Sequence, residues 1–140
     1  MPVTIKADFE EALLDQSVGA VRSAVTMARR ALQGICLDQG APASRIITKN
    51  NQQKQIKNDL SPQIDWLLKE QVITKPLHAM AHEVRTIGNT GAHPEDATDD
   101  TELGPEDAAE ILALLEAFSQ TLYVGPSILQ KRIQERQEPT

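Results

Sequence analysis

The sequence has few aromatic residues and almost no cysteine. Its aromatic side chains are Phe9, Trp66, Phe118 and Tyr123, four among 140 residues. A folded core of this chain must therefore be aliphatic, built from Leu, Ile, Val and Ala. Cys36 is the single cysteine, so no disulfide can form within the chain, and we expect a reducing, cytoplasmic location.

Long apolar runs and an excess of positive charge are also missing. No run approaches the ~18 apolar residues that span a bilayer, and residues 1–8 lack the apolar core of a signal peptide. We therefore expect no membrane contact, and the abrupt start is consistent with one domain of a longer protein. The net charge is −6, which argues against a general nucleic-acid coat protein, because phosphate binding uses clustered Lys and Arg.

The sequence is rich in apolar residues at helical spacing. Segment 18–35 carries an apolar residue at every third or fourth position, namely Val18, Val21, Val25, Ala28, Leu32 and Ile35. Similar stripes lie in 64–68, 77–87 and 108–122, and a shorter helix is expected over 8–16. The length suits one domain. We predict an all-α helical bundle of four to five main helices, forming a single domain over residues 1–140.

Residues that favour helix ends divide this pattern. Asp8 is expected to cap the first helix, and Gly40 to end the second. Residues 41–52 are predicted to form a polar loop followed by a short helix near Ile56 and Leu60. Because no alternating apolar–polar run exceeds about four residues, no sheet is expected.

The second half of the chain contains further predicted breaks. Gly88 and Gly91 are expected to interrupt the helix that begins near Thr74, and residues 94–104 to form an acidic loop. Gly125 and Pro126 are expected to end the last long helix. Residues 126–140 then remain as a tail, with a short helix over 127–136.

The segment from Arg85 to His93, R-T-I-G-N-T-G-A-H, combines a cation, an amide, two glycines and a histidine. Its structural interpretation is a glycine-terminated helix with an asparagine cap. Its functional interpretation is a site in which Arg85, Asn89 and His93 bind an anion and move protons.

One helix face extends this segment toward the N-terminus. His78, His82, Arg85 and Asn89 follow at steps of four, three and four, so they share a face that is either simply exposed or an anion site. His78 and His82 have a spacing that suits two metal ligands, but no third ligand is obvious and there is no cysteine pair. We therefore predict no metal and no other cofactor.

Basic residues form a second candidate surface. Arg29 and Arg30 lie away from the apolar stripe of their helix and are candidates for RNA binding, together with Arg22, Lys49, Lys54 and Lys57. The alternative is that these arginines pair with acids such as Glu10, Glu11 or those of residues 95–102.

Three stretches together resemble a known family. They are S-A-V-T-M-A-R-R-A-L-Q-G-I-C-L-D-Q-G at 23–40, H-E-V-R-T-I-G-N-T-G-A-H-P at 82–94, and E-D-A-A-E-I-L-A-L-L-E-A-F at 106–118 running into L-Y-V at 122–124. This pattern is similar to the bacterial domain of unknown function numbered 4145, grouped with the HEPN domains. The resemblance covers about residues 8–125, and its most specific part is I-G-N-T-G-A-H-P.

The resemblance implies a HEPN-like bundle that often forms a homodimer and occurs in defence-type proteins. Many relatives are metal-independent ribonucleases, whose signature is Arg, often followed by Asn, then His after four to six residues. Here His93 and Asn89 match the histidine and the asparagine. The position before Asn89 is Gly88 rather than Arg, and seven residues separate Arg85 from His93.

Two functions are compatible with these residues. The first is a non-catalytic dimerisation or partner-binding module within a larger bacterial or phage defence-system protein, in which the Gly88–His93 segment is structural and lines the dimer interface. The second is a homodimeric ribonuclease that uses His93 with Asn89 and Arg85, and guides RNA with Arg29 or Arg30. The acidic charge and the lack of arginine at position 88 favour the first function, and whether the chain is an enzyme is left open.

Overall fold

The computed structural model describes residues 1–92 and 103–138, and for residues 88–92 it describes the backbone only. The helices are α1 (Val3–Ser17), α2 (Val21–Asp38), α3 (Leu60–Lys69), α4 (Lys75–Ala92), α5 (Pro105–Ser119) and α6 (Gly125–Gln137). A π-helical segment η2 (Gln120–Val124) joins α5 to α6, and strands β1 (Ser44–Lys49) and β2 (Gln52–Lys57) follow α2. The predicted bundle of helices is thus confirmed, with a small two-stranded sheet added to it.

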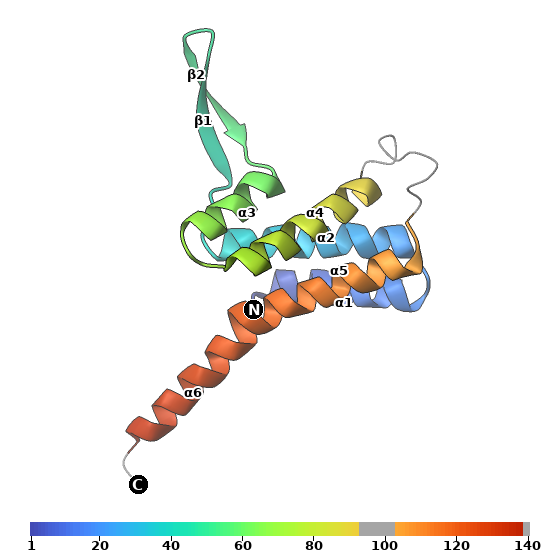
Figure 1. Cartoon of the computed structure of the whole chain (residues 1–140), viewed down its shortest axis with the longest axis vertical. Helices are drawn as coiled ribbons and strands as arrows, with labels where there is room; N and C mark the ends of the chain where they lie inside the picture. The colour runs from blue at the N-terminus through green and yellow to red at the C-terminus, as the bar shows by residue number, and fades with distance from the viewer. Residues whose placement is uncertain (93–102, 139–140) are drawn as a thin grey trace.

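The second helix forms the centre of the bundle. α2 packs against α1, α3, α4 and α5, and Figure 1 shows these helices grouped around it. Its predicted stripe is buried from Val25 onward, through Ala28, Leu32 and Ile35. The stripe of α5 is buried in the same core and includes the fully enclosed Phe118. The aliphatic core expected from the scarcity of aromatics is therefore present.

The first helix begins earlier than predicted. α1 starts at Val3 after Pro2, so Asp8 lies inside the helix and does not cap it. The reason is that the buried stripe of α1 starts at Ile5 and continues with Phe9 and Ala12. Burial of Ile5 against α2, where it contacts Gly34, extends the helix by more than a turn.

The predicted loop and short helix after Gly40 are wrong, because residues 44–57 form an antiparallel β-hairpin. The turn residues Asn50 and Asn51 have φ values of 54° and 60°, which suits the tight turn that matches strand twist. The hairpin projects from one end of the bundle (Figure 1), and most of its side chains are exposed. At its base, the Asn58 side chain donates to the Pro42 carbonyl and accepts from Arg45.

Two predicted helix interruptions are also absent. The backbone of α4 remains helical through Gly88 and Gly91 to Ala92. The last long helix does not break at Gly125 and Pro126, since the π-helical turn η2 lets the Gly125 N–H bond to the Gln120 carbonyl. A wider turn of this kind re-routes the hydrogen bonds around a proline that has no N–H. The tail helix is therefore a direct continuation of α5.

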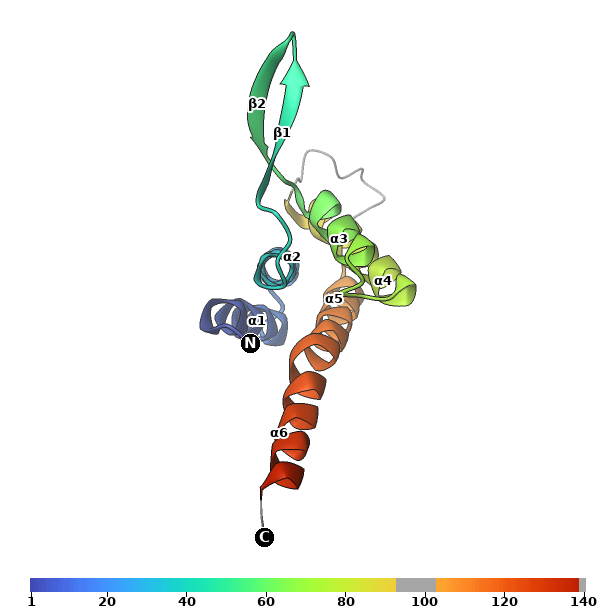
Figure 2. The same ribbon diagram turned by 90° about the vertical axis from the view of Figure 1, so that its left-hand side faces the viewer.

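This continuous helix projects beyond the bundle. α6 packs against η2 and against no other described element, and Figure 2 shows it pointing in the direction opposite to that of the hairpin. Among the described residues, the run Pro105–Gln137 is long and apolar enough to cross a membrane by length and composition alone. Core helices share this length and composition, and α5 places Ile111, Leu115 and Phe118 in the core.

Candidate functional site on the α3–α4 face

Three polar side chains from α3 and α4 converge on one point of the surface. His78 Nε2 and His82 Nε2 lie 2.8 and 2.9 Å from the same carboxylate oxygen, Asp65 Oδ1. The two Nε2 atoms are 3.2 Å apart, and the two rings meet edge to face with centroids 4.5 Å apart. His78 and His82 thus lie on one face of α4, as predicted, and Asp65 of α3 adds a carboxylate to that face.

A cation borders this group. Arg85 Nε donates to His82 Nδ1 over 3.3 Å. An arginine can only donate, so Nδ1 of this ring is the acceptor and His82 carries its proton on Nε2, facing Asp65. Arg85 is therefore engaged within the α4 face, one turn before Asn89.

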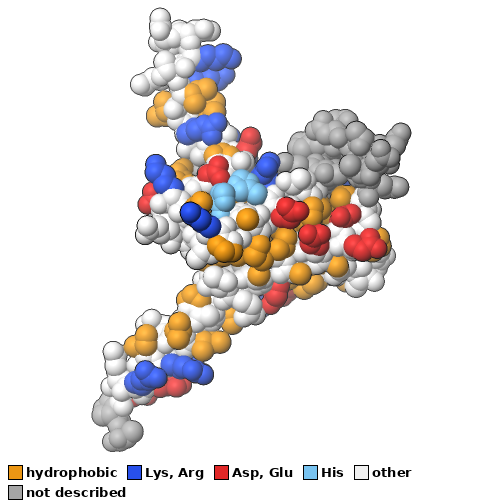
Figure 3. Space-filling model, in the orientation of Figure 1, with side chains coloured by type: hydrophobic (Ala, Val, Ile, Leu, Met, Phe, Trp, Pro, Cys, Tyr) orange, Lys and Arg blue, Asp and Glu red, His pale blue; other side chains and the backbone are white. Residues whose placement is uncertain are grey.

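The group is partly open to solvent. The His78 and His82 side chains are 22% and 26% exposed, whereas Asp65 is 59% exposed. In Figure 3 histidine side chains form a pale blue patch on the visible face of the bundle. Hydrogen bonds from His78 and, next, from His82 hold the pKa of Asp65 below its ordinary value of 3.8. An ionised carboxylate beside two imidazoles can hold a cation or position a proton donor near neutral pH.

Asp65 is the functional candidate that sequence reasoning missed. It sits 13 residues before His78 in another helix, where it reads as an ordinary exposed acid. No local spacing connects the two positions, and only the antiparallel packing of α3 on α4 brings them together. Among the described residues, Asp65, His78 and His82 offer the ligand atoms that could hold a metal ion.

Of the three predicted catalytic residues Arg85, Asn89 and His93, the structure describes Arg85 in full and only the backbone of Asn89. Arg85 lies on α4 as described, and Asn89 belongs to the helical backbone near the end of α4. The Asn89 side chain and the whole of His93 lie outside the described residues. The structure therefore leaves the proposed meeting of Arg85, Asn89 and His93 as a prediction.

The basic residues fall on two separate elements. On α2, Arg30 pairs with Asp8 of α1 at 3.3 Å while 71% of its side chain stays exposed, and Arg29 is half-buried. On the hairpin, Lys49 and Lys54 are exposed, and residues 44–57 contain four cations and no acid. The pairing of Arg30 agrees with the ion-pair interpretation, although the partner is Asp8 rather than Glu10 or Glu11.

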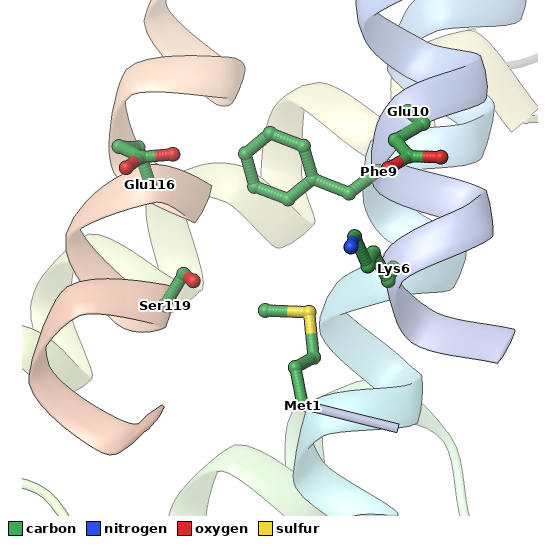
Figure 4. Close-up of a pocket in the computed structure, with 6 residues that line it drawn as sticks. All are labelled: Met1, Lys6, Phe9, Glu10, Glu116 and Ser119. Atoms are coloured by element: carbon green, nitrogen blue, oxygen red, sulfur yellow. The ribbon is translucent and has the colours of Figure 1, made fainter. Parts of the chain in front are cut away.

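Two surface pockets lie elsewhere. One of about 400 Å³ lies between α1 and the end of α5, and Figure 4 shows Phe9 pointing from α1 toward α5, with Met1 nearby. Another of about 290 Å³ includes Asp8, Arg30 and Lys57. The first combines apolar side chains with Lys6, Glu10 and Glu116 at its edges, which resembles an anchor pocket more than a reaction site.

The comparisons with known proteins identify the family and leave its activity open. No curated protein and no solved structure gives a significant match to the chain. The family described as "Domain of unknown function (DUF4145)" matches residues 10–137, which is most of the chain. The match includes the hairpin, the Asp65–His78–His82 group and all of α6. The chain belongs to the DUF4145 family.

Proposed function

We propose that this chain is a non-catalytic, HEPN-like module that forms a homodimer and binds partners within a bacterial or phage defence-type protein. The observation that carries the proposal is α6, a 13-residue helix whose described side chains are all exposed. Ile128, Leu129 and Ile133 are 50%, 61% and 49% exposed. The HEPN-like class and the defence setting rest on the resemblance of residues 23–40, 82–94 and 106–124, of which 82–94 is the most specific part.

A solitary helix of this length is marginal in water. Helices shorter than about 12–15 residues gain most of their stability from packing of an apolar face. Because α6 continues from α5 through η2, it does not bear the free-energy cost of forming a first helical turn. It still has no core element to pack against within the described chain. A second copy of the chain would supply that surface.

The adjacent surface supports the same proposal. The outer side of α1 exposes Val3, Leu14 and Val18 at 83%, 59% and 72%. The pocket between α1 and α5 lies beside the base of α6, because Ser119 lines it and η2 begins at the next residue. An apolar side chain of a second copy would find Met1 and Phe9 there, with charged residues around them.

Light scattering tests the proposal. The monomer has a mass of 15.4 kDa, and we expect the wild type to have twice that mass at micromolar concentration. The double variant Leu129→Glu/Ile133→Glu should be monomeric with unchanged helical circular dichroism. The double variant Gln130→Glu/Gln134→Glu adds the same charge to the same helix and should stay dimeric. A wild type that is strictly monomeric at high concentration would contradict the proposal.

A metal-independent ribonuclease is the second candidate. Two observations favour it: Arg85 lies beside the histidine pair on α4, and the hairpin carries four cations without an acid. In this function Arg85 would stabilise phosphate charge and His93 would transfer protons, with Asn89 in support.

An RNA-cleavage and cell-toxicity assay separates the two functions. If the chain is a ribonuclease, His93→Ala and Arg85→Ala should each abolish cleavage and relieve growth inhibition. A triple variant Lys49→Gln/Lys54→Gln/Lys57→Gln should then weaken RNA binding and flatten its salt dependence. A wild type that neither cuts RNA nor slows growth removes the enzymatic candidate and leaves the dimerisation proposal intact.

A further inference from the structure

We infer that Asp65, His78 and His82 form a binding site for a divalent transition-metal ion, for which Zn²⁺ is the best fit. Neither proposed function requires this site. Two imidazole nitrogens and one carboxylate oxygen are a donor set that zinc readily accepts in proteins. The described ligand atoms lie 2.8, 2.9 and 3.2 Å from one another, so they form a compact, nearly equilateral triangle.

The size of this triangle matches one face of a metal coordination shell. Metal–ligand bonds of about 2.1 Å separate neighbouring ligand atoms by about 3.0 Å in an octahedron and about 3.4 Å in a tetrahedron. The observed separations are within a few tenths of an ångström of the first figure and would have to widen by about 0.2–0.6 Å to reach the second. An ion can therefore sit above the triangle without any movement of the backbone.

The ligands come from two elements that hold their positions. His78 and His82 are one helical turn apart on α4, and Asp65 comes from α3, which packs against α4. Bound metal would join the two helices at this point. The two histidines are about a quarter exposed and Asp65 more than half exposed, so the outer side of the site is accessible. Water or a partner group can therefore complete the coordination.

The absence of an obvious third ligand was the reason to predict no metal from the sequence. Asp65 supplies that ligand from another helix, at 2.8 and 2.9 Å from the two histidine nitrogens. Hydrogen bonds already hold the three groups together. The ligands are therefore preorganised, so an ion would bind without first having to bring them together.

Arg85 determines how the site responds to the ion. Its Nε donates to His82 Nδ1, so the His82 proton is on Nε2. Metal binding at Nε2 requires that proton to leave this nitrogen, and neutral His82 then carries its proton on Nδ1. Two N–H groups would face each other across the Arg85–His82 contact, so Arg85 must turn away. Zinc binding and this hydrogen bond therefore exclude one another.

Calorimetric titration of Zn²⁺ into the full chain, prepared without a polyhistidine tag and stripped by a chelator, tests the inference. We expect one equivalent to bind to the wild type. His78→Ala, His82→Ala and Asp65→Asn should each weaken binding at least about tenfold. Arg85→Ala should bind at least as tightly as the wild type, because the competing hydrogen bond is gone. Glu83→Gln, an exposed change on the same helix, should bind unchanged.

Thermal melting gives an independent readout. Zinc at a hundredfold excess over its Kd should raise the wild-type Tm by about 5–10 °C and leave the Tm of Asp65→Asn nearly unchanged. Asp65 is mostly exposed, so this variant remains informative if a histidine variant fails to fold. The inference is overturned if the wild type binds no zinc, or if Asp65→Asn and the histidine variants bind it as the wild type does.

Discussion

At the scale of single residues, burial explains the roles of the few unusual side chains. Cys36 is fully buried on α2, and Phe118 is the largest fully enclosed side chain of the core. Tyr123 joins η2 to the end of α2, because its hydroxyl donates to Asp38 Oδ2 over 2.6 Å. These three residues lie in the bundle and outside the Asp65–His78–His82 group, so they test the fold independently of the site.

Stability should decline in mild alkali because of Cys36. Burial raises the pKa of its thiol from an ordinary value of 9.0 to about 12. Between these values the unfolded chain loses the proton and the folded chain keeps it, so the free energy of unfolding falls as pH rises. The expected slope is at most about 1.4 kcal/mol per pH unit.

Chemical denaturation at a series of pH values measures this decline. Burial and then the bond to Asp38 raise the pKa of Tyr123 from 10.0 to about 12. The stabilisation of the folded chain by the Tyr123 hydroxyl is therefore lost only above pH 10. Cys36→Ala should therefore move the onset of the decline from about pH 9 to about pH 10. An onset that is the same in both proteins would show that the thiol is not protected by burial.

Replacing Phe118 should affect stability more than any exposed substitution. Phe118→Ala should lower the free energy of unfolding by about 3–5 kcal/mol, because it removes apolar contacts and leaves a cavity. Phe118→Leu should cost only about 1 kcal/mol, since it keeps most of the volume. Denaturant unfolding provides the measurement. A loss below about 1 kcal/mol for the alanine variant would mean that α5 is not packed as described.

At the scale of elements, the hairpin and α6 differ from the rest of the molecule. The core helices bury continuous stripes, whereas the hairpin keeps most of its side chains exposed and is fixed at its base by Asn58. Segments with few buried contacts open locally without unfolding the whole protein. The hairpin should therefore behave as a separate local unit.

A turn variant tests the independence of the hairpin. Asn51 has φ of 60°, a conformation that costs a β-branched residue roughly 1–2 kcal/mol. Asn51→Val should speed amide exchange in β1 and β2 and leave the Tm of the bundle within about 1 °C of the wild type. Asn51→Gly should keep the hairpin protected. A large fall in global Tm for Asn51→Val would make the hairpin part of the cooperative core.

At the scale of the whole molecule, two projections leave the same end of the helical bundle and point in opposite directions (Figures 1 and 2). At that end, Tyr123 of η2 donates to Asp38 at the end of α2. One projection is basic and the other exposes apolar side chains, so the molecule presents two chemically different surfaces. The α3–α4 site lies on the bundle itself. Association through α6 would leave the hairpin and this site free for other partners.

Dimer formation should make thermal stability depend on concentration. If α6 binds a second copy, the wild-type Tm should rise by a few degrees between about 1 and 100 µM protein. The Tm of Leu129→Glu/Ile133→Glu should not change over that range. Differential scanning calorimetry at several concentrations provides the measurement. A wild-type Tm independent of concentration would indicate that α6 remains unpaired in solution.

Periodicity along the chain determined the helical bundle. The stripes of α2, α4 and α5 follow helical spacing so closely that their burial could be predicted from the sequence. Gly40 was likewise a reliable signal, because its φ of 108° and its closeness to Trp66 suit only glycine. The hairpin was missed because Ile46 and Ile47 are consecutive apolar residues among polar ones, of which Ile46 is exposed and Ile47 half-buried. Its strands therefore lack the apolar alternation that marks a half-buried strand.

Only the tertiary structure determined which residues meet in the Asp65–His78–His82 group and that α6 projects from the bundle. Asp65 and His82 become neighbours through the packing of α3 on α4, which no pattern within either helix encodes. The continuation of α5 into α6 depends on the π-helical turn η2. The Gly125–Pro126 pair predicts a break in the helix and gives no sign of such a turn. Local spacing can fix which face of a helix is apolar, but contacts between distant residues depend on how those faces pack, and here that packing brings the candidate ligands together.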